Sequence, residues 1–98
     1  MSLDLAAFRQ SLTQATPPRD LTPALQALWW DAKGDWDRAH GCVDNESGKD
    51  AARIHAYLHR KEGDEGNARY WYGTAGATFF QGSLDAEWVE LAAARLMG

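Results

Sequence analysis

The chain has 98 residues and a mass of 10.9 kDa, and we expect one domain over residues 1–98 because a core of this size seldom divides. Its net charge of −4 argues against nucleic acid or a membrane surface as the partner, and no apolar run reaches the roughly 20 residues that span a bilayer. The single cysteine, Cys42, excludes an internal disulfide and suits the reducing cytoplasm.

Alanine and leucine dominate the aliphatic side chains of this sequence. Seventeen Ala and ten Leu stand against only two Val and one Ile. Because β-branched residues are the ones that fill sheets well, this composition predicts an all-α fold. Turn signals divide the chain into about six amphipathic stretches, and we expect each stretch to form a helix.

The first two predicted helices are separated by consecutive prolines. A helix is expected over about residues 4–13, and the segment TPPRD at 16–20 ends it because proline cannot continue a helix. Thr22 then caps a second helix that has Pro23 at its first position, the arrangement most favoured at a helix start. We expect this helix to bury a stripe of residues, Leu25, Leu28, Trp29 and Ala32, and to end at Gly34.

The next two predicted helices are joined by a polar loop. The third begins after Asp35, and the loop DNESG at 44–48 ends it. The fourth covers about Lys49 to Glu62, and Gly63 stops it.

The last two predicted helices flank a loop that contains an aromatic pair. Asp64 caps the fifth helix and Gly76 closes it. The loop at 77–82 holds Phe79 and Phe80, which we expect to be exposed. Ser83 caps the sixth helix, whose first half carries acidic residues that suit a helix N-terminus, namely Asp85, Glu87 and Glu90.

An internal repeat relates residues 27–40 to residues 56–69. Four small or turn residues of the first segment, Ala27, Gly34, Asp35 and Ala39, align with Ala56, Gly63, Asp64 and Ala68 of the second. Glycine permits the tight turn of a helical hairpin, and alanine lets its two helices approach closely. The spacing resembles the tetratricopeptide (TPR) unit, although the period is shorter than the roughly 34 residues of that unit. We predict two TPR-like antiparallel hairpins, flanked by an N-terminal and a C-terminal capping helix.

Two longer segments, LQALWWDAKGDWDRAH and HAYLHRKEGDEGNARYWY, are similar to the signature segments of a family of small uncharacterised helical proteins, mainly bacterial and fungal. The resemblance covers residues 21–76 and implies a helical fold, and no activity comes with it. The residues that match the signatures are Trp30, Gly34, Trp36, His40, His55, His59, Arg60, Gly63, Asp64, Asn67, Tyr70, Trp71 and Tyr72.

A pair of histidines indicates one candidate site. His55 and His59 are four residues apart, so both rings can face the same point, and Glu62 follows one turn later. Two imidazoles and a carboxylate form a ligand set that suits Zn²⁺. The alternative is that His55 is a neutral core histidine held by a backbone carbonyl or by Asp64.

A basic stripe on the same helix indicates a second candidate site. Arg53, Tyr57, Arg60 and Lys61 would line the groove of a TPR-like hairpin and could clamp a small anionic ligand or an acidic protein segment. The alternative is a solvated face that pairs with Asp50, Glu62 and Glu65.

Aromatic residues add a third surface to these two sites. Trp30 and Tyr70 lie off the helical stripes and could make apolar contact with a partner, or they could cover the seam between the hairpins. A homodimer through Phe79, Phe80 and Trp88 is a further alternative.

The preferred function from the sequence is a non-enzymatic, cytoplasmic binding module for a protein segment or a small anionic ligand. The alternative is a metal-binding protein or metal-dependent enzyme that uses His55, His59 and Glu62. No catalytic residue is predicted, because helix capping accounts for the acidic cluster of Asp31, Asp35 and Asp37.

Overall fold

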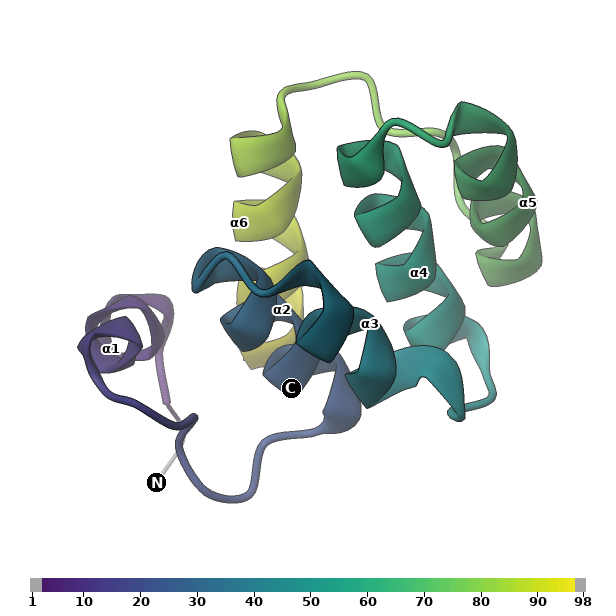
Figure 1. The fold of residues 1–98 in the computed structure, drawn as a ribbon. Helices are drawn as coiled ribbons and strands as arrows, with labels where there is room; N and C mark the ends of the chain where they lie inside the picture. Colours follow the sequence, from purple (N-terminus) through teal and green to yellow (C-terminus); the bar gives the residue numbers. More distant parts are fainter. Residues whose placement is uncertain (1–2, 97–98) are drawn as a thin grey trace.

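The computed structural model describes residues 3–96, and this part of the chain contains six α-helices and no strand, which confirms the predicted all-α fold (Figure 1). The helices are α1 (Leu5–Gln10), α2 (Pro23–Ala32), α3 (Trp36–Asp44), α4 (Lys49–Glu62), α5 (Glu65–Ala75) and α6 (Leu84–Leu96), with a short 3₁₀ turn (Ser11–Thr13) after α1. None of the helices in residues 3–96 combines the length and the apolar character needed to cross a bilayer.

Side-chain caps fix the starts of the helices where the sequence predicts them. The hydroxyl of Thr22 accepts a hydrogen bond from the Leu25 amide, and Asp35, Asp64 and Ser83 cap α3, α5 and α6 in the same way. The first helix is shorter than expected, because the chain tightens into the 3₁₀ turn at Ser11. The Ser11 hydroxyl donates to the Phe8 carbonyl and accepts from the Trp29 indole, and this pair of bonds anchors the turn to α2.

Two helical hairpins, α2–α3 and α4–α5, form the centre of the fold (Figure 1). Gly34 and Gly63 sit in the turns with φ of +86° and +90°, a backbone region that strains any residue with a Cβ. The four alanines of the repeat, Ala27, Ala39, Ala56 and Ala68, are all fully buried. The small-residue spacing therefore serves close helix packing, as the repeat predicts.

The last helix, α6, packs back against α2 and α4, and α1 contacts α6 from the other side. The main core lies between these helices and centres on Phe8, Leu28, Trp29, Ile54 and Leu58. A smaller cluster of Ala56, Ala68 and Tyr72 lies between α4 and α5.

Two details of the predicted core are corrected by the structure. Ala32, placed on the buried stripe of the second helix, is exposed, and the neighbouring Asp31 is buried with an exposed fraction of 3%. Phe79 and Phe80, expected to be exposed, are half-buried and pack against the Tyr72 cluster. In both places tertiary packing against another helix decides which side chain is covered.

Candidate functional site: a histidine cluster on two hairpins

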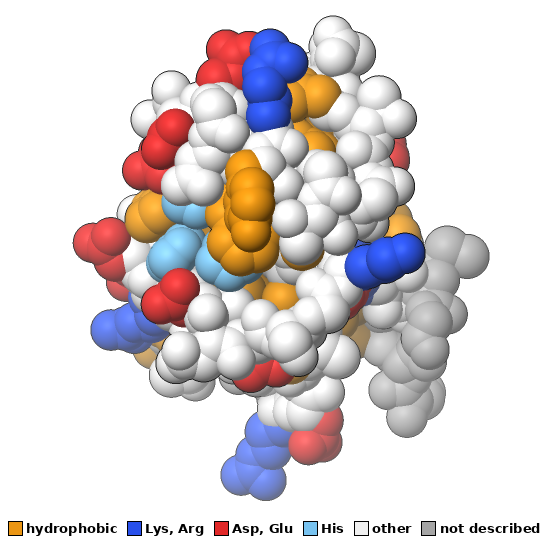
Figure 2. Space-filling view, turned by 90° about the vertical axis from the view of Figure 1, so that its right-hand side faces the viewer, with side chains coloured by type: hydrophobic (Ala, Val, Ile, Leu, Met, Phe, Trp, Pro, Cys, Tyr) orange, Lys and Arg blue, Asp and Glu red, His pale blue; other side chains and the backbone are white. Residues whose placement is uncertain are grey.

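All three histidines of the chain converge at the junction of the two hairpins. His40 comes from α3, and His55 and His59 come from α4. One ring nitrogen of each histidine lies within 4.8 Å of a ring nitrogen of the other two. The histidine side chains form one group on the face shown in Figure 2, beside a hydrophobic side chain. Residues far apart in the sequence thus create a compact set of nitrogen ligands.

The hydrogen bonds of His55 leave one ring nitrogen without a partner. Its Nε2 lies 3.1 Å from the Val43 carbonyl oxygen, which can only accept, so Nε2 carries the proton of the neutral ring. The other nitrogen, Nδ1, is buried and has no hydrogen-bond partner. A buried lone pair without a donor costs stability, so a native structure that retains one calls for a specific explanation.

His59 has a carboxylate on its outer side. Its Nδ1 lies 2.5 Å from Glu62 Oε2, and a carboxylate that accepts from Nδ1 leaves Nε2 of the neutral ring as the lone-pair nitrogen. His40 is the most accessible of the three, with 25% of its side chain exposed, and its Nε2 lies 4.0 Å from Asp44 Oδ1. His55 and His59 therefore each have an oxygen acceptor within hydrogen-bond distance of one ring nitrogen, the arrangement that orients imidazoles in metal sites.

Two indole rings hold the imidazoles in place. Trp71 of α5 stacks on His55 with ring centres 4.1 Å apart, and Trp36 of α3 stacks on His40 at 5.0 Å. The Trp36 indole nitrogen donates to the Leu58 carbonyl at 2.8 Å, which ties α3 to α4 next to the cluster. The aromatic walls restrict ring rotation and keep water from much of the site.

The environment of His55 favours its neutral form. Burial lowers the pKa of His55 below its usual value, and the nearby His40 and His59 rings act in the same direction, while the hydrogen bond to Val43 opposes them. A neutral imidazole is the form that binds a metal ion, so this ring is ready to act as a ligand at neutral pH.

The structure changes the ligand set that the sequence predicts. His55 and His59 do come together, but their third companion is His40, and Glu62 lies instead with His59 and Asp64. The expectation that a backbone carbonyl holds His55 is also met, by Val43. Sequence reasoning missed His40 because its place in the cluster depends on how α3 packs against α4. The signal that could have found it is that the chain has only three histidines.

The predicted basic stripe is divided between two buried carboxylates. On one side, Lys61 Nζ lies 2.7 Å from Asp31 Oδ1, and the Tyr57 hydroxyl donates to Asp31 Oδ2 at 2.6 Å. Tyr57 itself is buried, and burial together with the Asp31 hydrogen bond raises its pKa. Asp31 is thus an internal partner of α4, whereas helix capping had been expected to account for it.

On the other side, Glu87 of α6 is fully buried and forms ion pairs with two arginines. Arg53 Nη1 and Arg60 Nη1 each lie 2.8 Å from one of its carboxylate oxygens, and the Tyr72 hydroxyl also donates to it. Burial and the bond to Glu87 raise the pKa of Tyr72 to about 12. The stripe therefore neutralises acids of the core.

The alternative partners proposed for the basic stripe are engaged elsewhere. Asp50 pairs with Arg95 and Glu65 with Arg69, each at 2.7 Å, while Glu62 contacts His59. The alternative of a solvated, surface-paired face is therefore corrected as well. Helix-local pairing rules could not find Asp31 or Glu87, because each lies on a different helix from its basic partners.

The remaining aromatic candidates lie in different environments. Tyr70 is 64% exposed, while Trp30 is half-buried against Trp29 and has the Arg38 guanidinium 4.3 Å above its ring. The three residues of the dimer hypothesis pack within the chain. Trp88 is buried and donates to the Leu28 carbonyl, and Phe79 and Phe80 pack on α4 and α5.

Comparisons with known proteins add no relative to this geometry. No protein-family model matches the chain, and neither a curated protein nor a solved structure does.

Proposed function

We propose that this protein binds one transition-metal ion, with Zn²⁺ as the best match, through His40, His55 and His59. The observation that carries the proposal is the buried Nδ1 of His55, a lone pair without a partner in a group that contains every histidine of the chain. A bound cation would give this atom the partner that it lacks.

The chemistry of the group favours a borderline metal. Neutral imidazoles suit Zn²⁺, Cu²⁺ and Ni²⁺ better than Mg²⁺ or Ca²⁺, which prefer oxygen ligands. Zn–N bonds of about 2.0–2.1 Å place tetrahedral ligand nitrogens roughly 3.3 Å apart. The nitrogens here lie within 4.8 Å of one another, and a bound ion would draw them closer.

Three protein ligands leave one tetrahedral position for water or an added small ligand. This is the coordination of accessible zinc sites, whereas purely structural sites have four protein ligands. The Glu62 carboxylate would hold the proton of His59 on Nδ1 and so keep Nε2 ready for the metal. A bound ion would also link α3 to α4 and stabilise the junction of the hairpins.

The test is a titration of untagged, metal-stripped protein with Zn²⁺ by isothermal calorimetry, supported by native mass spectrometry. We expect one ion per chain. His55→Gln removes the Nδ1 ligand and leaves an amide to reach the Val43 carbonyl, so it should abolish binding and preserve the fold. Glu46→Gln, an exposed change in the loop between α3 and α4, is the matched control. A wild-type protein that stays bare, or a His55→Gln variant that binds as tightly, would contradict the proposal.

A Co²⁺ titration gives an independent readout of coordination. Tetrahedral Co²⁺ absorbs visible light much more strongly than octahedral Co²⁺, so a strong band in the wild type that is lost in His40→Ala would place His40 among the ligands. A weak spectrum that His40→Ala leaves unchanged would mean that the ion sits elsewhere.

A second candidate function is a cytoplasmic, TPR-like interaction module for a protein segment. The observation that favours it is the exposure of Tyr70 on the second hairpin, since aromatic residues on the surface are common at partner interfaces. Pull-downs with Tyr70→Ser and with the exposed control Thr78→Ala would test it. We expect partners to be lost only with Tyr70→Ser, and retention of every partner would count against the module. Anion binding by Arg53 and Arg60 is not proposed, because a ligand would have to displace Glu87.

A further inference from the structure

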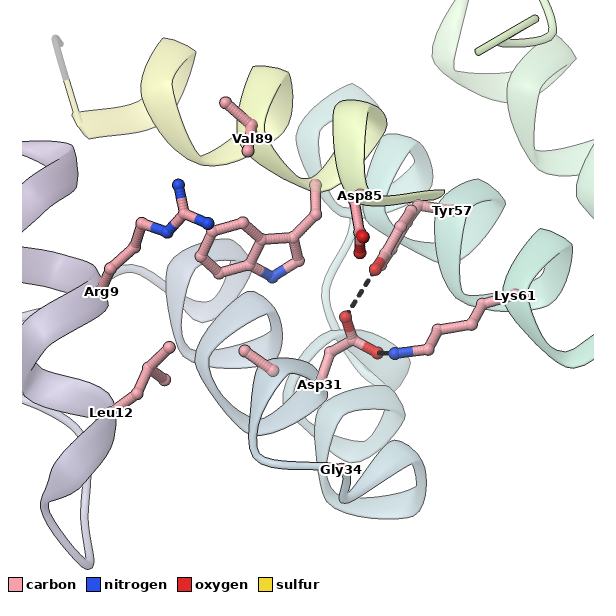
Figure 3. A pocket seen from close by; sticks show the side chains of 10 residues that line it. Arg9, Leu12, Asp31, Gly34, Tyr57, Lys61, Asp85 and Val89 are labelled. Carbon is pink, nitrogen blue, oxygen red and sulfur yellow. Dashed lines mark hydrogen bonds and ion pairs between the residues drawn. The ribbon is translucent and has the colours of Figure 1, made fainter. Parts of the chain in front are cut away.

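A pocket lies at a junction that uses none of the histidines. It has a volume of about 400 Å³ and opens between α1, α2, α4 and α6 (Figure 3). Its polar and aromatic lining includes Arg9, Asp31, Tyr57, Lys61, Asp85 and Trp88. Four separate elements thus contribute polar or aromatic side chains to one concave surface of the size that small ligands occupy.

The charges of this pocket are separated along its length. Figure 3 shows Asp31, Asp85 and Lys61 toward one end and Arg9 toward the other. Trp88 also lines the pocket, and its ring lies beside the Arg9 guanidinium. The first end carries a net negative charge, because one lysine faces two carboxylates, and the other end is positive. A dipolar ligand with an apolar middle would match both ends and the ring.

Two of these charges have no ion-pair partner in the described part of the chain. Asp85 and Arg9 are absent from the ion pairs of residues 3–96, and Arg9 lies with its guanidinium carbon 5.9 Å from the Trp88 ring centre. They stand in contrast to Asp31, whose two oxygens are taken by Tyr57 and Lys61. Asp85 and Arg9 are therefore the groups available to a ligand.

The floor of the pocket is rigid. Tyr57 and Asp31 are buried and bonded to each other, and the Trp88 indole is fixed by its bond to the Leu28 carbonyl at 2.9 Å. Tyr57 donates its proton to Asp31, so its hydroxyl oxygen keeps a lone pair for a donor in the pocket. A preformed floor reduces the entropy that a ligand loses on binding.

We propose that this pocket binds a small zwitterion in which an apolar spacer separates an ammonium group from a carboxylate. The ammonium group would sit between Asp85 and the Tyr57 hydroxyl oxygen, and the carboxylate would accept the guanidinium fork of Arg9. The methylene spacer would lie against the Trp88 ring. A free ω-amino acid has this chemistry, and so does the C-terminal lysine of a peptide. The proposal is independent of the metal site.

The test is binding of 6-aminohexanoic acid to the full chain, followed by calorimetry and by the indole N–H resonance of Trp88. Hexylamine and hexanoic acid are matched probes that each lack one charge. We expect 6-aminohexanoic acid to bind and to shift the Trp88 resonance, and each single-charge probe to bind at least about tenfold more weakly. No shift at millimolar concentration, or equal binding of the three compounds, would overturn the proposal.

Two variants and one control test whether Asp85 and Arg9 bind the ligand. Asp85→Asn and Arg9→Gln remove side-chain charges that take part in no ion pair within residues 3–96, so both variants should fold and each should weaken binding at least about tenfold. Glu90→Gln makes the same acid-to-amide change on an exposed part of α6 outside the pocket and should leave binding unchanged. Equal affinity of all three variants would place the ligand elsewhere.

The source of the ligand is distinguished by a peptide pair. A short peptide that ends in lysine retains the ω-ammonium group and the terminal carboxylate, whereas its C-terminal amide loses the carboxylate. Binding of the acid form and not of the amide, with an affinity above that of 6-aminohexanoic acid, assigns the pocket to a protein C-terminus. Binding of 6-aminohexanoic acid alone assigns it to a free metabolite, and either result supports the zwitterion chemistry.

Discussion

The two sides of α4 differ in whether their polar side chains have partners within the fold. On the side that faces α2 and α6, the buried carboxylates of Asp31 and Glu87 form ion pairs with the charged residues Arg53, Arg60 and Lys61. On the side that faces α3 and α5, His55 keeps a buried nitrogen without a partner. The first side is complete in its charge pairing, although Arg53 Nη1 makes no aligned hydrogen bond to Glu87, and we call it the completed side. The histidine side lacks a component.

The difference separates a structural role from a binding role. A buried charge that already has an opposite charge beside it gains little from a ligand, because the ligand must first displace that internal partner. A buried group with an unused lone pair gains a bond that the native fold does not supply. The sequence favours the basic side as the binding surface, and the contacts in the structure favour the histidine side.

Removal of Glu87 should be the most damaging change on the completed side. Glu87→Gln leaves two largely buried arginines without their counter-charge, and breaking such a pair costs about 3–5 kcal/mol. Urea unfolding followed by circular dichroism measures the loss of free energy of unfolding. The control is Glu65→Gln, whose ion pair with Arg69 is two-thirds exposed and should change stability by less than about 1 kcal/mol. Similar losses for both variants would show that the Glu87 network is not a structural centre.

On the histidine side, Glu62 tests whether the outer carboxylate contributes to metal binding. It contacts His59 and is itself partly exposed, so Glu62→Gln should leave the metal-free protein nearly as stable as the wild type. Loss of the carboxylate acceptor should weaken Zn²⁺ binding by about 10–100-fold, the usual effect of removing an outer partner of a metal-binding histidine. Competition with a chelator of known affinity measures the dissociation constant. An unchanged constant would remove Glu62 from the site while leaving the three histidines in place.

Tyr57 tests the smaller of the two networks on the completed side, the one around Asp31. Tyr57→Phe deletes the hydroxyl that donates to the buried Asp31 carboxylate and leaves the ion pair with Lys61 intact. A hydrogen bond to a charged group contributes about 1.5–3 kcal/mol, so we expect a loss near the lower end of this range. The same substitution at the exposed Tyr70 is the matched control and should cost well under about 0.5 kcal/mol in urea unfolding. Equal costs would mean that Asp31 does not depend on Tyr57.

The local structure of the fold was predictable because its signals are local. Thr22, Asp35, Asp64 and Ser83 cap the helices that follow them, and each cap is recognised from a few neighbouring residues. The exception is Ser11, where a bond to Trp29 from a distant helix tightens the chain into a 3₁₀ turn. Sequence patterns predict what neighbours along the chain decide, and they fail where tertiary contacts take over.

The candidate site was predictable only in part for the same reason. His55 and His59 lie on one helix, so their spacing alone brings them together. His40 joins them only after α3 packs on α4, and no spacing rule connects it to the pair. Asp31 and Glu87 were also missed as partners, because each was read by its own helix position. The sequence offers one further signal: the chain has only three histidines, so any site built from three imidazoles must include His40.

The last prediction concerns alkaline pH and the completed side. The pKa of Tyr72 is raised to about 12, mainly by burial and by its bond to Glu87, so the folded state holds this proton at a pH where the unfolded chain, with a pKa near 10, releases it. Stability from this group is therefore present below pH 10 and is lost as the pH rises from about 10 to 12. One proton limits the slope to about 1.4 kcal/mol per pH unit.

The measurement for Tyr72 is urea unfolding at several pH values across this window. Tyr72→Phe removes the titrating hydroxyl, so its stability should fall less steeply with pH than that of the wild type, even though it starts lower. Tyr57→Phe should also flatten the curve, because burial and Asp31 raise the pKa of Tyr57 in the same direction. The other groups that change charge in this window are the same in each pair of curves and cancel in the comparison. Parallel curves for the wild type and Tyr72→Phe would mean that the folded protein does not protect the Tyr72 proton. The Glu87 network would then be more open to water than its burial in the structure indicates.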